Sequence, residues 1–160
     1  MKNSYVIQPI GRISYENNMC CLHLDKTYIS GIKNLNGFKY LQIIWWGHLN
    51  DNPKSRSTLI INKPYKTAPK QLGVFATRSD SRPNPILITT IEVIKIDEQT
   101  GEIYTPYIDA EDGTFILNIK PYHKMERVKD CVVPGWCKHW PEWYEDTESF
   151  NWKDEFSFEA

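Results

Sequence analysis

One polar loop of this sequence, GVFATRSDSRPNPI from Gly73 to Ile86, carries two arginines and two prolines. Each proline fixes its own φ and pushes the preceding residue into an extended conformation, so Arg82 and Asn84 are held in place before any ligand arrives. A guanidinium binds carboxylates and phosphates through paired hydrogen bonds. The loop therefore predicts a preorganised anion site on Arg78 and Arg82. An alternative stays open, in which one arginine ties the loop to an internal carboxylate.

Two further polar groups stand beside predicted strands. Three acids crowd the segment from Asp109 to Thr114, where Asp112-Gly113 also signals a tight turn. These acids could bind a ligand that bears hydroxyls and positive charge, although such a segment is often only a turn. Gly47 and His48 follow an apolar strand, where a glycine admits the close approach of a flat ligand. A single histidine at this place can equally be a structural hydrogen-bonding residue.

Several common catalytic motifs are absent from the sequence. It contains no GxGxxG after a first strand, no GxxxxGK[ST], no HExxH and no GxSxG. Rossmann-type cofactor binding, phosphate-loop hydrolysis and the common hydrolase mechanisms are therefore disfavoured.

The net charge is −1, but its sign varies along the chain. The segment from Asp51 to Pro85 holds seven Lys or Arg against two acids, and the segment from Glu142 to Ala160 holds seven acids against one lysine. A basic face and an acidic tail are expected from this distribution, although a basic segment is often an ordinary solvated surface.

The sequence predicts a cytoplasmic protein with reduced thiols. Its N-terminal residues show no secretion signal, and no apolar run is long enough to span a bilayer. We expect no membrane contact and no metal, because the cysteines do not repeat a spacing such as CxxC. The alternative metal site would use Cys137 and His139 together with Cys20, Cys21 and His23.

Strand-like segments recur along the chain, whereas long helical patterns are missing. The segments YVIQPIGRI, YLQIIWW, STLII, PILITTIEVIKI, IYTPYI and TFILNI are rich in β-branched and aromatic residues. They predict an all-β fold, a small closed or nearly closed antiparallel β-barrel with few short helices. We expect this barrel domain to occupy residues 1–125. Residues 126–160 are expected to form an extended aromatic and acidic tail, packed on the barrel or on a dimer partner.

Local patterns add detail to this fold. The run from Ile86 to Ile96 changes the parity of its apolar residues after position 93, which suggests a bulge or a strand buried on both faces. The turn at Asp97–Gly101 predicts an antiparallel meander, and Asp112-Gly113 predicts a hairpin of residues 103–108 with 114–119. One or two helical turns are expected in residues 30–38, and a helix start at Pro141.

The motifs GVFATRS and RPNPI, followed later by DGT and IKPY, make the sequence from about Tyr5 to Tyr122 resemble a known family. This is the TrmO family, also called TsaA-like or YaeB-like, of S-adenosylmethionine-dependent tRNA methyltransferases. The resemblance implies a β-barrel methyltransferase that works as a homodimer. It also implies methylation of the exocyclic amine of threonylcarbamoyl-adenosine in a tRNA.

The resemblance further implies roles for individual positions. Cofactor contacts are implied at Gly47, His48, Arg78 and Ile88, and at the acidic turn of Asp109, Ala110, Glu111 and Asp112. We expect substrate contacts at Arg82, Asn84, Lys120 and Tyr122. Arg82 and Lys120 would hold the threonyl carboxylate or an adjacent phosphate.

The chemistry of S-adenosylmethionine suits these residue types. Its carboxylate suits an arginine, its ribose hydroxyls suit carboxylates, and its sulfonium favours an acidic or carbonyl-lined surrounding. Methyl transfer needs alignment and enclosure, with no covalent intermediate on the protein. No catalytic residue is identified from the sequence, and a nucleophile such as Cys131 is unnecessary.

Two other functions stay open at this point. A cofactor-dependent methyltransferase could act on a different nucleic acid or on a small molecule. A non-catalytic barrel could instead bind RNA or a small ligand, using basic residues for charge and aromatic rings for stacking. Because the chain is nearly neutral, a dimer that joins two basic faces would favour RNA binding.

Overall fold

The computed structural model describes residues 4–16 and 19–157. Its contacts divide the chain into two compact units. The first comprises Met1–Asp51 and Asn84–Arg127, and the second comprises Asn52–Pro83 and Val128–Ala160. Within the described residues, no helix combines the length and the apolar character that a membrane span requires.

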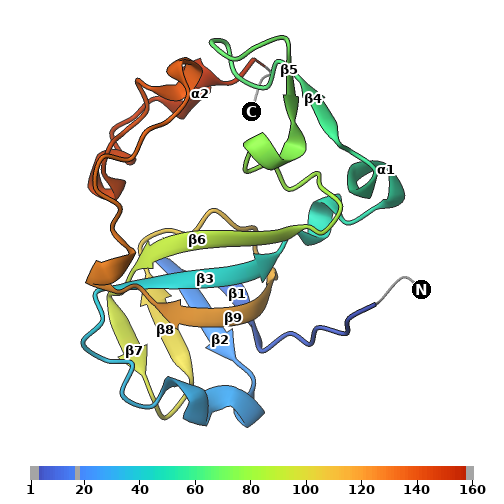
Figure 1. Cartoon of the computed structure of the whole chain (residues 1–160). Helices are drawn as coiled ribbons and strands as arrows, with labels where there is room; N and C mark the ends of the chain where they lie inside the picture. The colour runs from blue at the N-terminus through green and yellow to red at the C-terminus, as the bar shows by residue number, and fades with distance from the viewer. Residues whose placement is uncertain (1–3, 17–18, 158–160) are drawn as a thin grey trace. The chain divides into compact units, whose positions relative to one another are not determined.

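The first unit is built on one sheet, which has seven strands in the described residues (Figure 1). They are β1 (Gly11–Glu16), β2 (Met19–Leu24), β3 (Tyr40–Trp46), β6 (Ile86–Glu92), β7 (Lys95–Asp97), β8 (Glu102–Thr105) and β9 (Phe115–Pro121). Their order is β6-β3-β9-β1-β2-β8-β7, with antiparallel pairing throughout. The short 3-10 helices are η1 (Lys26–Ile32), η2 (His48–Asn50) and η4 (Lys124–Glu126). The predicted antiparallel character with few helices is thereby confirmed.

Alternation along the strands places one apolar face in the core. In β3, Leu41 and Ile43 are fully buried, whereas the residues between the buried positions are partly exposed. Leu22 of β2 pairs with Ile13 on one side and with Ile103 on the other, so three neighbouring strands present branched side chains to the same interior. Burying one such side chain stabilises the fold by about 1.5–3 kcal/mol.

The closed or nearly closed barrel expected from the sequence is not confirmed. In the described residues, the ladder of hydrogen bonds leaves β6 and β7 as the two ends of the sheet. These end strands follow each other in the chain, separated only by Val93 and Ile94. Ile91 and Ile96 are buried on either side of this break, while Ile94 is exposed. The predicted bulge or doubly buried strand is therefore wrong, because the change of parity marks a break between two strands, where the chain passes from one end of the sheet to the other.

The meander at residues 95–105 is confirmed, but the hairpin at Asp112-Gly113 is wrong. Strand β8 pairs with β7, across a turn in which Gly101 has a φ of 80°. Gly113 also takes a positive φ, 75°, so the second predicted turn exists. Its flanking strands do not pair, however, because β1 and β2 lie between β8 and β9 in the sheet. The chain between β8 and β9 crosses both strands before it rejoins the sheet.

The second unit contains a small sheet and several short helical turns. Strand β4 (Ile60–Asn62) pairs with β5 (Gln71–Gly73). Helix α1 (Pro53–Arg56) begins after Asn52, whose side chain accepts the N–H of Ser55 at 3.0 Å. The remaining turns are η3 (Val74–Ala76), η5 (Gly135–Cys137), η6 (Tyr144–Asp146) and α2 (Trp152–Glu155). In place of the predicted helix at Pro141, the chain forms only the short turn η6, and the turn expected in residues 30–38 is η1, which starts earlier.

Aromatic rings join the tail to the segment around Tyr65 within this second unit. The ring of Tyr65 stacks on Trp136 at a centroid distance of 5.4 Å and meets the edge of Trp140 at 4.9 Å. Trp140 in turn contacts Trp152 at 5.5 Å. Pairs of this kind stabilise by about 0.5–1.5 kcal/mol beyond their buried area. Several half-buried aromatic residues of the tail thus form one cluster with Tyr65 in this unit.

A carboxylate, Glu155, completes this aromatic cluster. Its Oε1 lies 2.8 Å from His139 Nε2, and its Oε2 accepts the indole N–H of Trp140 at 3.0 Å. The hydrogen bond from Trp140, followed by that from His139, holds the pKa of Glu155 below its ordinary value of 4.5.

We expect acid to destabilise the second unit through Glu155. A carboxyl group with a lowered pKa in the folded state contributes its full stability above the unfolded pKa of 4.5 and loses it as the pH falls through the folded value. Urea unfolding, followed by tryptophan fluorescence at acidic and neutral pH, measures this effect. Glu155→Gln should flatten the acid dependence, whereas Glu148→Gln, at an exposed position of the tail, should keep it. An unchanged acid profile in Glu155→Gln would refute the assignment.

Candidate functional site

The acidic turn between β8 and β9 is anchored on strand β1 by Tyr15. The Tyr15 hydroxyl lies 2.7 Å from the carbonyl oxygens of Ile108 and Ala110. The Tyr15 backbone N–H donates to Asp112 Oδ1 at 3.1 Å, and the N–H of Gly113 donates to the carbonyl of Ile13 at 2.8 Å. These contacts hold the turn as a fixed structure although most of its side chains are exposed.

A pocket of about 260 Å³ lies at this turn, lined by Tyr15 and by residues 107–112. Ile108 is buried beneath it, while Asp109 and Glu111 are exposed. Burial, followed by nearby thiol and acidic groups, raises the pKa of Tyr15 above its ordinary value, so its hydroxyl remains a hydrogen-bond donor at neutral pH. The pocket thus offers carboxylates and carbonyls, which suit a ligand with hydroxyl groups or positive charge.

Tyr15→Phe should lower the free energy of unfolding by about 0.5–1.5 kcal/mol, because the turn loses its hydroxyl anchor. Chemical denaturation measures this change. Tyr5→Phe is the matched control, since Tyr5 is 85% exposed, and its effect should be near zero. Equal stability of the two variants would show that the hydroxyl does not anchor the turn.

Gly47 and His48 follow strand β3 and lie next to the same turn. The Nδ1 atom of His48 is 3.3 Å from the Oγ1 of Thr114, which is buried directly after the acidic turn. The N–H of Gly47 donates to the carbonyl of Pro85 at 2.8 Å. Because Pro85 belongs to the RPNP motif and is fully buried, the end of β3 is tied both to this motif and to the turn. Within the first unit, the structure therefore brings Gly47 and His48 close to both Pro85 and the acidic turn.

The other predicted positions of the first unit lie along β6 and β9. Ile88 of β6 is opposite Ile44 and is 41% exposed. Asn84 precedes β6 and accepts the N–H of Ile86 through its carbonyl at 2.7 Å. Lys120 of β9 is opposite Gln42, and the N–H of Tyr122 donates to the carbonyl of Tyr40.

Lys120 and Tyr122 are distant from the turn along the sheet. They lie beside the beginning of β3, whereas His48 follows its end. Six residues of extended strand correspond to about 20 Å. The structure therefore does not gather these two residues with the acidic turn.

Residues 73–83 of the arginine loop belong to the second unit, where the side chain of Arg82 holds the loop by hydrogen bonds. The Nε of Arg82 donates to the carbonyl of Ser79 at 2.5 Å, and one terminal nitrogen donates to the carbonyls of Thr77 and Val74 at 2.7 and 3.3 Å. The hydroxyl of Ser79 accepts the N–H of Ser81 at 3.2 Å. The expectation of a preorganised loop thus has a second physical basis. The alternative interpretation, in which an arginine binds an internal carboxylate, is not supported at Arg82, whose hydrogen bonds in the described residues go to backbone carbonyls.

The four cysteines are free thiols, as predicted. Cys20 is buried in the core, where burial above all raises its pKa to about 12. Cys21 lies on the other face of β2. Burial is again the largest effect, and it raises the pKa of this thiol to about 11. Such groups are neutral at physiological pH and therefore poor nucleophiles.

Residues 4–126 match the family model of the tRNA-methyltransferase O N-terminal domain. This chain belongs to that family. A probable S-adenosyl-L-methionine-binding protein of Methanocaldococcus jannaschii is 34% identical over 122 residues, which are 72% of this chain and 90% of the relative. A similarly named protein of Pyrococcus horikoshii is 35% identical over 117 residues, 73% of this chain and 82% of the relative. The family resemblance drawn from GVFATRS and RPNPI is confirmed.

The fold is also similar to that of a solved family structure. TrmO from Pseudomonas aeruginosa matches with a TM-score of 0.61 at 22% sequence identity, over 81% of this chain and 62% of that one. This chain therefore spans less than two thirds of that protein. A tRNA (adenine(37)-N6)-methyltransferase of Eikenella corrodens is 32% identical over 77 residues, 48% of this chain and 44% of the relative.

Two parts of the site could not be found by sequence reasoning. Tyr15 is an ordinary strand residue by pattern, and its contacts with the acidic turn depend on a separation of more than ninety positions in the chain. Thr114 is part of the DGT motif, but its contact with His48 could not be found from the sequence, since it arises only when β3 and β9 pair.

Proposed function

We propose that this chain is an S-adenosylmethionine-dependent methyltransferase that acts on the exocyclic amine of an adenine in tRNA. We further propose that this adenine carries a threonylcarbamoyl group. The observation that carries the proposal is the convergence of Gly47, His48 and the acidic turn at one place of the sheet, in a chain of this family. The names of the relatives support the choice of cofactor and acceptor.

The acidic turn has the donor set expected for the ribose and the sulfonium. Asp109 and Glu111 expose carboxylates at the pocket, and these groups accept hydrogen bonds from hydroxyls. The pocket of about 260 Å³ is smaller than the roughly 300–1,000 Å³ of usual ligand sites, so the turn would hold only one part of the cofactor. His48 and Gly47 lie close enough to the turn to contact another part of the cofactor.

The bound cofactor supplies an activated methyl group, and the residues of this chain would supply alignment. Enclosure and orientation can contribute on the order of 7–11 kcal/mol to such a displacement. The carbamoyl group weakens the adenine amine as a nucleophile but makes its proton easier to lose. The raised pKa values of Cys20 and Cys21 agree with a mechanism in which no thiol attacks the substrate.

Recognition of the RNA would fall to the basic segment of the second unit. Its residues between Asn52 and Pro83 are rich in lysine and arginine, and phosphate contacts of this kind make affinity salt-dependent. We propose a homodimer that combines two such segments. Light scattering should give twice the chain mass of 18.8 kDa, and a monomer at assay concentration would contradict this part of the proposal.

Transfer of a labelled methyl group tests the function. We expect label on tRNA that carries the threonylcarbamoyl group, and none on the same tRNA without it. Label on both RNAs would indicate a tRNA methyltransferase that does not require the threonylcarbamoyl group. Cofactor binding without label on either RNA would indicate another acceptor, and the absence of both would indicate a non-catalytic binding protein.

A further inference from the structure

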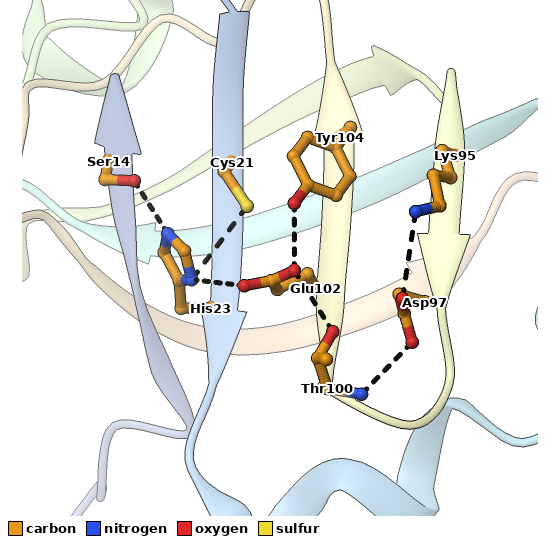
Figure 2. Close-up of polar contacts among 8 residues, drawn as sticks. All are labelled: Ser14, Cys21, His23, Lys95, Asp97, Thr100, Glu102 and Tyr104. Atoms are coloured by element: carbon orange, nitrogen blue, oxygen red, sulfur yellow. Dashed lines mark hydrogen bonds and ion pairs between the residues drawn. The ribbon is translucent and has the colours of Figure 1, made fainter. Parts of the chain in front are cut away.

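Three potential metal ligands meet on the outer face of the sheet of the first unit (Figure 2). Cys21 and His23 alternate along β2 and therefore point to the same side. Glu102 of β8 is directly opposite His23 in the register. One ligand atom from each residue lies within 4.8 Å of the other two. This cluster joins the thiolate, imidazole and carboxylate ligands that zinc prefers.

The distance between His23 and Glu102 is longer than that of an ordinary N–H···O hydrogen bond. His23 Nδ1 is 3.9 Å from Cys21 Sγ and 3.5 Å from Glu102 Oε1. A direct N–H···O bond is about 2.7–3.2 Å long. A tetrahedral Zn²⁺, with bonds of about 2.3 Å to sulfur and about 2.0–2.1 Å to nitrogen and oxygen, holds such ligand atoms about 3.3–3.6 Å apart. The separation of His23 from Glu102 falls in this range, and that of His23 from Cys21 is about 0.3 Å above it, so a small shift of the thiol would bring all three side chains onto one ion.

The remaining polar atoms of the ligands are held by neighbouring residues. His23 Nε2 lies 2.7 Å from the hydroxyl of Ser14 on β1, which leaves Nδ1 directed toward Cys21 and Glu102 (Figure 2). Glu102 Oε2 accepts hydrogen bonds from Tyr104 at 2.8 Å and from Thr100 at 3.1 Å, so Oε1 faces His23. Contacts of this kind orient metal ligands in known sites and affect the affinity for the ion.

The cluster is reachable from solvent on one side. Cys21 is 3% exposed, whereas the side chains of His23 and Glu102 are 39% and 29% exposed. The thiol thus forms the buried end of the cluster and the other two ligands form its rim. Three protein ligands on a partly open surface leave a fourth position for water.

We propose that Cys21, His23 and Glu102 form a binding site for one Zn²⁺ ion. The imidazole would bind through Nδ1 and donate its Nε2–H to Ser14. The carboxylate would bind through Oε1, and a water molecule would complete the tetrahedron. This site was not expected from the sequence. The alternative metal site there combined Cys21 and His23 with Cys20, Cys137 and His139, and it did not include Glu102.

Titration of the chelator-treated full chain with Co²⁺, a spectroscopic substitute for Zn²⁺, tests the site. We expect one ion per chain, a sulfur-to-cobalt charge-transfer absorption band, and loss of the band on addition of Zn²⁺. Cys21→Ser should abolish the band, whereas Cys131→Ser, which alters an exposed thiol, should keep it. No band in the unchanged chain, or a band that survives in Cys21→Ser, would overturn the proposal.

Further variants keep the test decisive if the buried Cys21→Ser variant does not fold. His23→Gln and Glu102→Gln alter partly exposed positions, and each should weaken Zn²⁺ binding more than a change in an orienting residue does. Ser14→Ala should weaken it by about 10- to 100-fold, because the imidazole loses its orienting partner. Unchanged Zn²⁺ affinity in His23→Gln would refute the site, whatever the methyltransferase activity of the chain.

Discussion

Neutralising the acidic turn should weaken binding of S-adenosylmethionine by about 10- to 100-fold per carboxylate that contacts the cofactor. Hydrogen bonds to a charged group contribute about 1.5–3 kcal/mol each, and Asp109→Asn and Glu111→Gln keep the side-chain shape while removing the charge. Both residues are exposed at the pocket, so the variants should fold normally. Calorimetric titration with the cofactor measures the loss directly.

Glu92→Gln is the matched control for these variants. Glu92 is a carboxylate of the same sheet that pairs with Lys39, and it is opposite Tyr40 at the beginning of β3. Its replacement should leave the affinity for the cofactor unchanged. If Asp109→Asn, Glu111→Gln and Glu92→Gln all bind like the unchanged chain, the acidic turn is not the cofactor site.

Arg82→Ala should lower kcat/KM for tRNA methylation by about 100-fold or more. The guanidinium makes three hydrogen bonds to carbonyls of its own loop, and bonds with a charged donor are worth about 1.5–3 kcal/mol each. Their loss would release the loop that carries Arg78 and the RPNP motif. Steady-state methylation assays with saturating cofactor give the size of the effect.

Arg82→Lys separates a loop-holding role from a simple charge effect. Lysine keeps the charge but cannot reproduce the planar set of donors, so activity should stay low if Arg82 holds the loop. If Arg82→Lys instead recovers the methylation activity, Arg82 contacts a phosphate of the RNA directly. The salt dependence of RNA binding should then also be restored. Lys70→Ala, which removes an exposed charge from the same unit, should have a much smaller effect.

Several individual strands could be predicted from the sequence because alternation of apolar residues is a local property, although β2 and β5 were not among the predicted segments. In β3 it places Leu41 and Ile43 in the core, whereas the parity change before Ile96 marks a break between β6 and β7 in place of the predicted bulge or doubly buried strand. The partners of these strands could not be predicted in the same way. Asp112-Gly113 forms a turn as expected, yet β1 and β2 separate its flanking strands, and nothing near the turn encodes that insertion.

For the site as well, residue types could be recognised in the sequence, whereas contacts between distant segments could not. The glycine, histidine and acids were identified from residue type, and the contact of His48 with Thr114 brings two of these groups together. The role of Arg82 was harder to predict, since a guanidinium suits backbone carbonyls as well as carboxylates. The Cys21, His23 and Glu102 cluster depends on the register of β2 with β8, which a spacing pattern cannot reveal.

A crystal structure with S-adenosylhomocysteine tests the central claim most directly. The account predicts that the ribose hydroxyls contact the carboxylates of the turn from Asp109 to Asp112, with His48 and Gly47 beside the same ligand. The ligand bound elsewhere on the chain, with that turn in contact only with solvent, would contradict it.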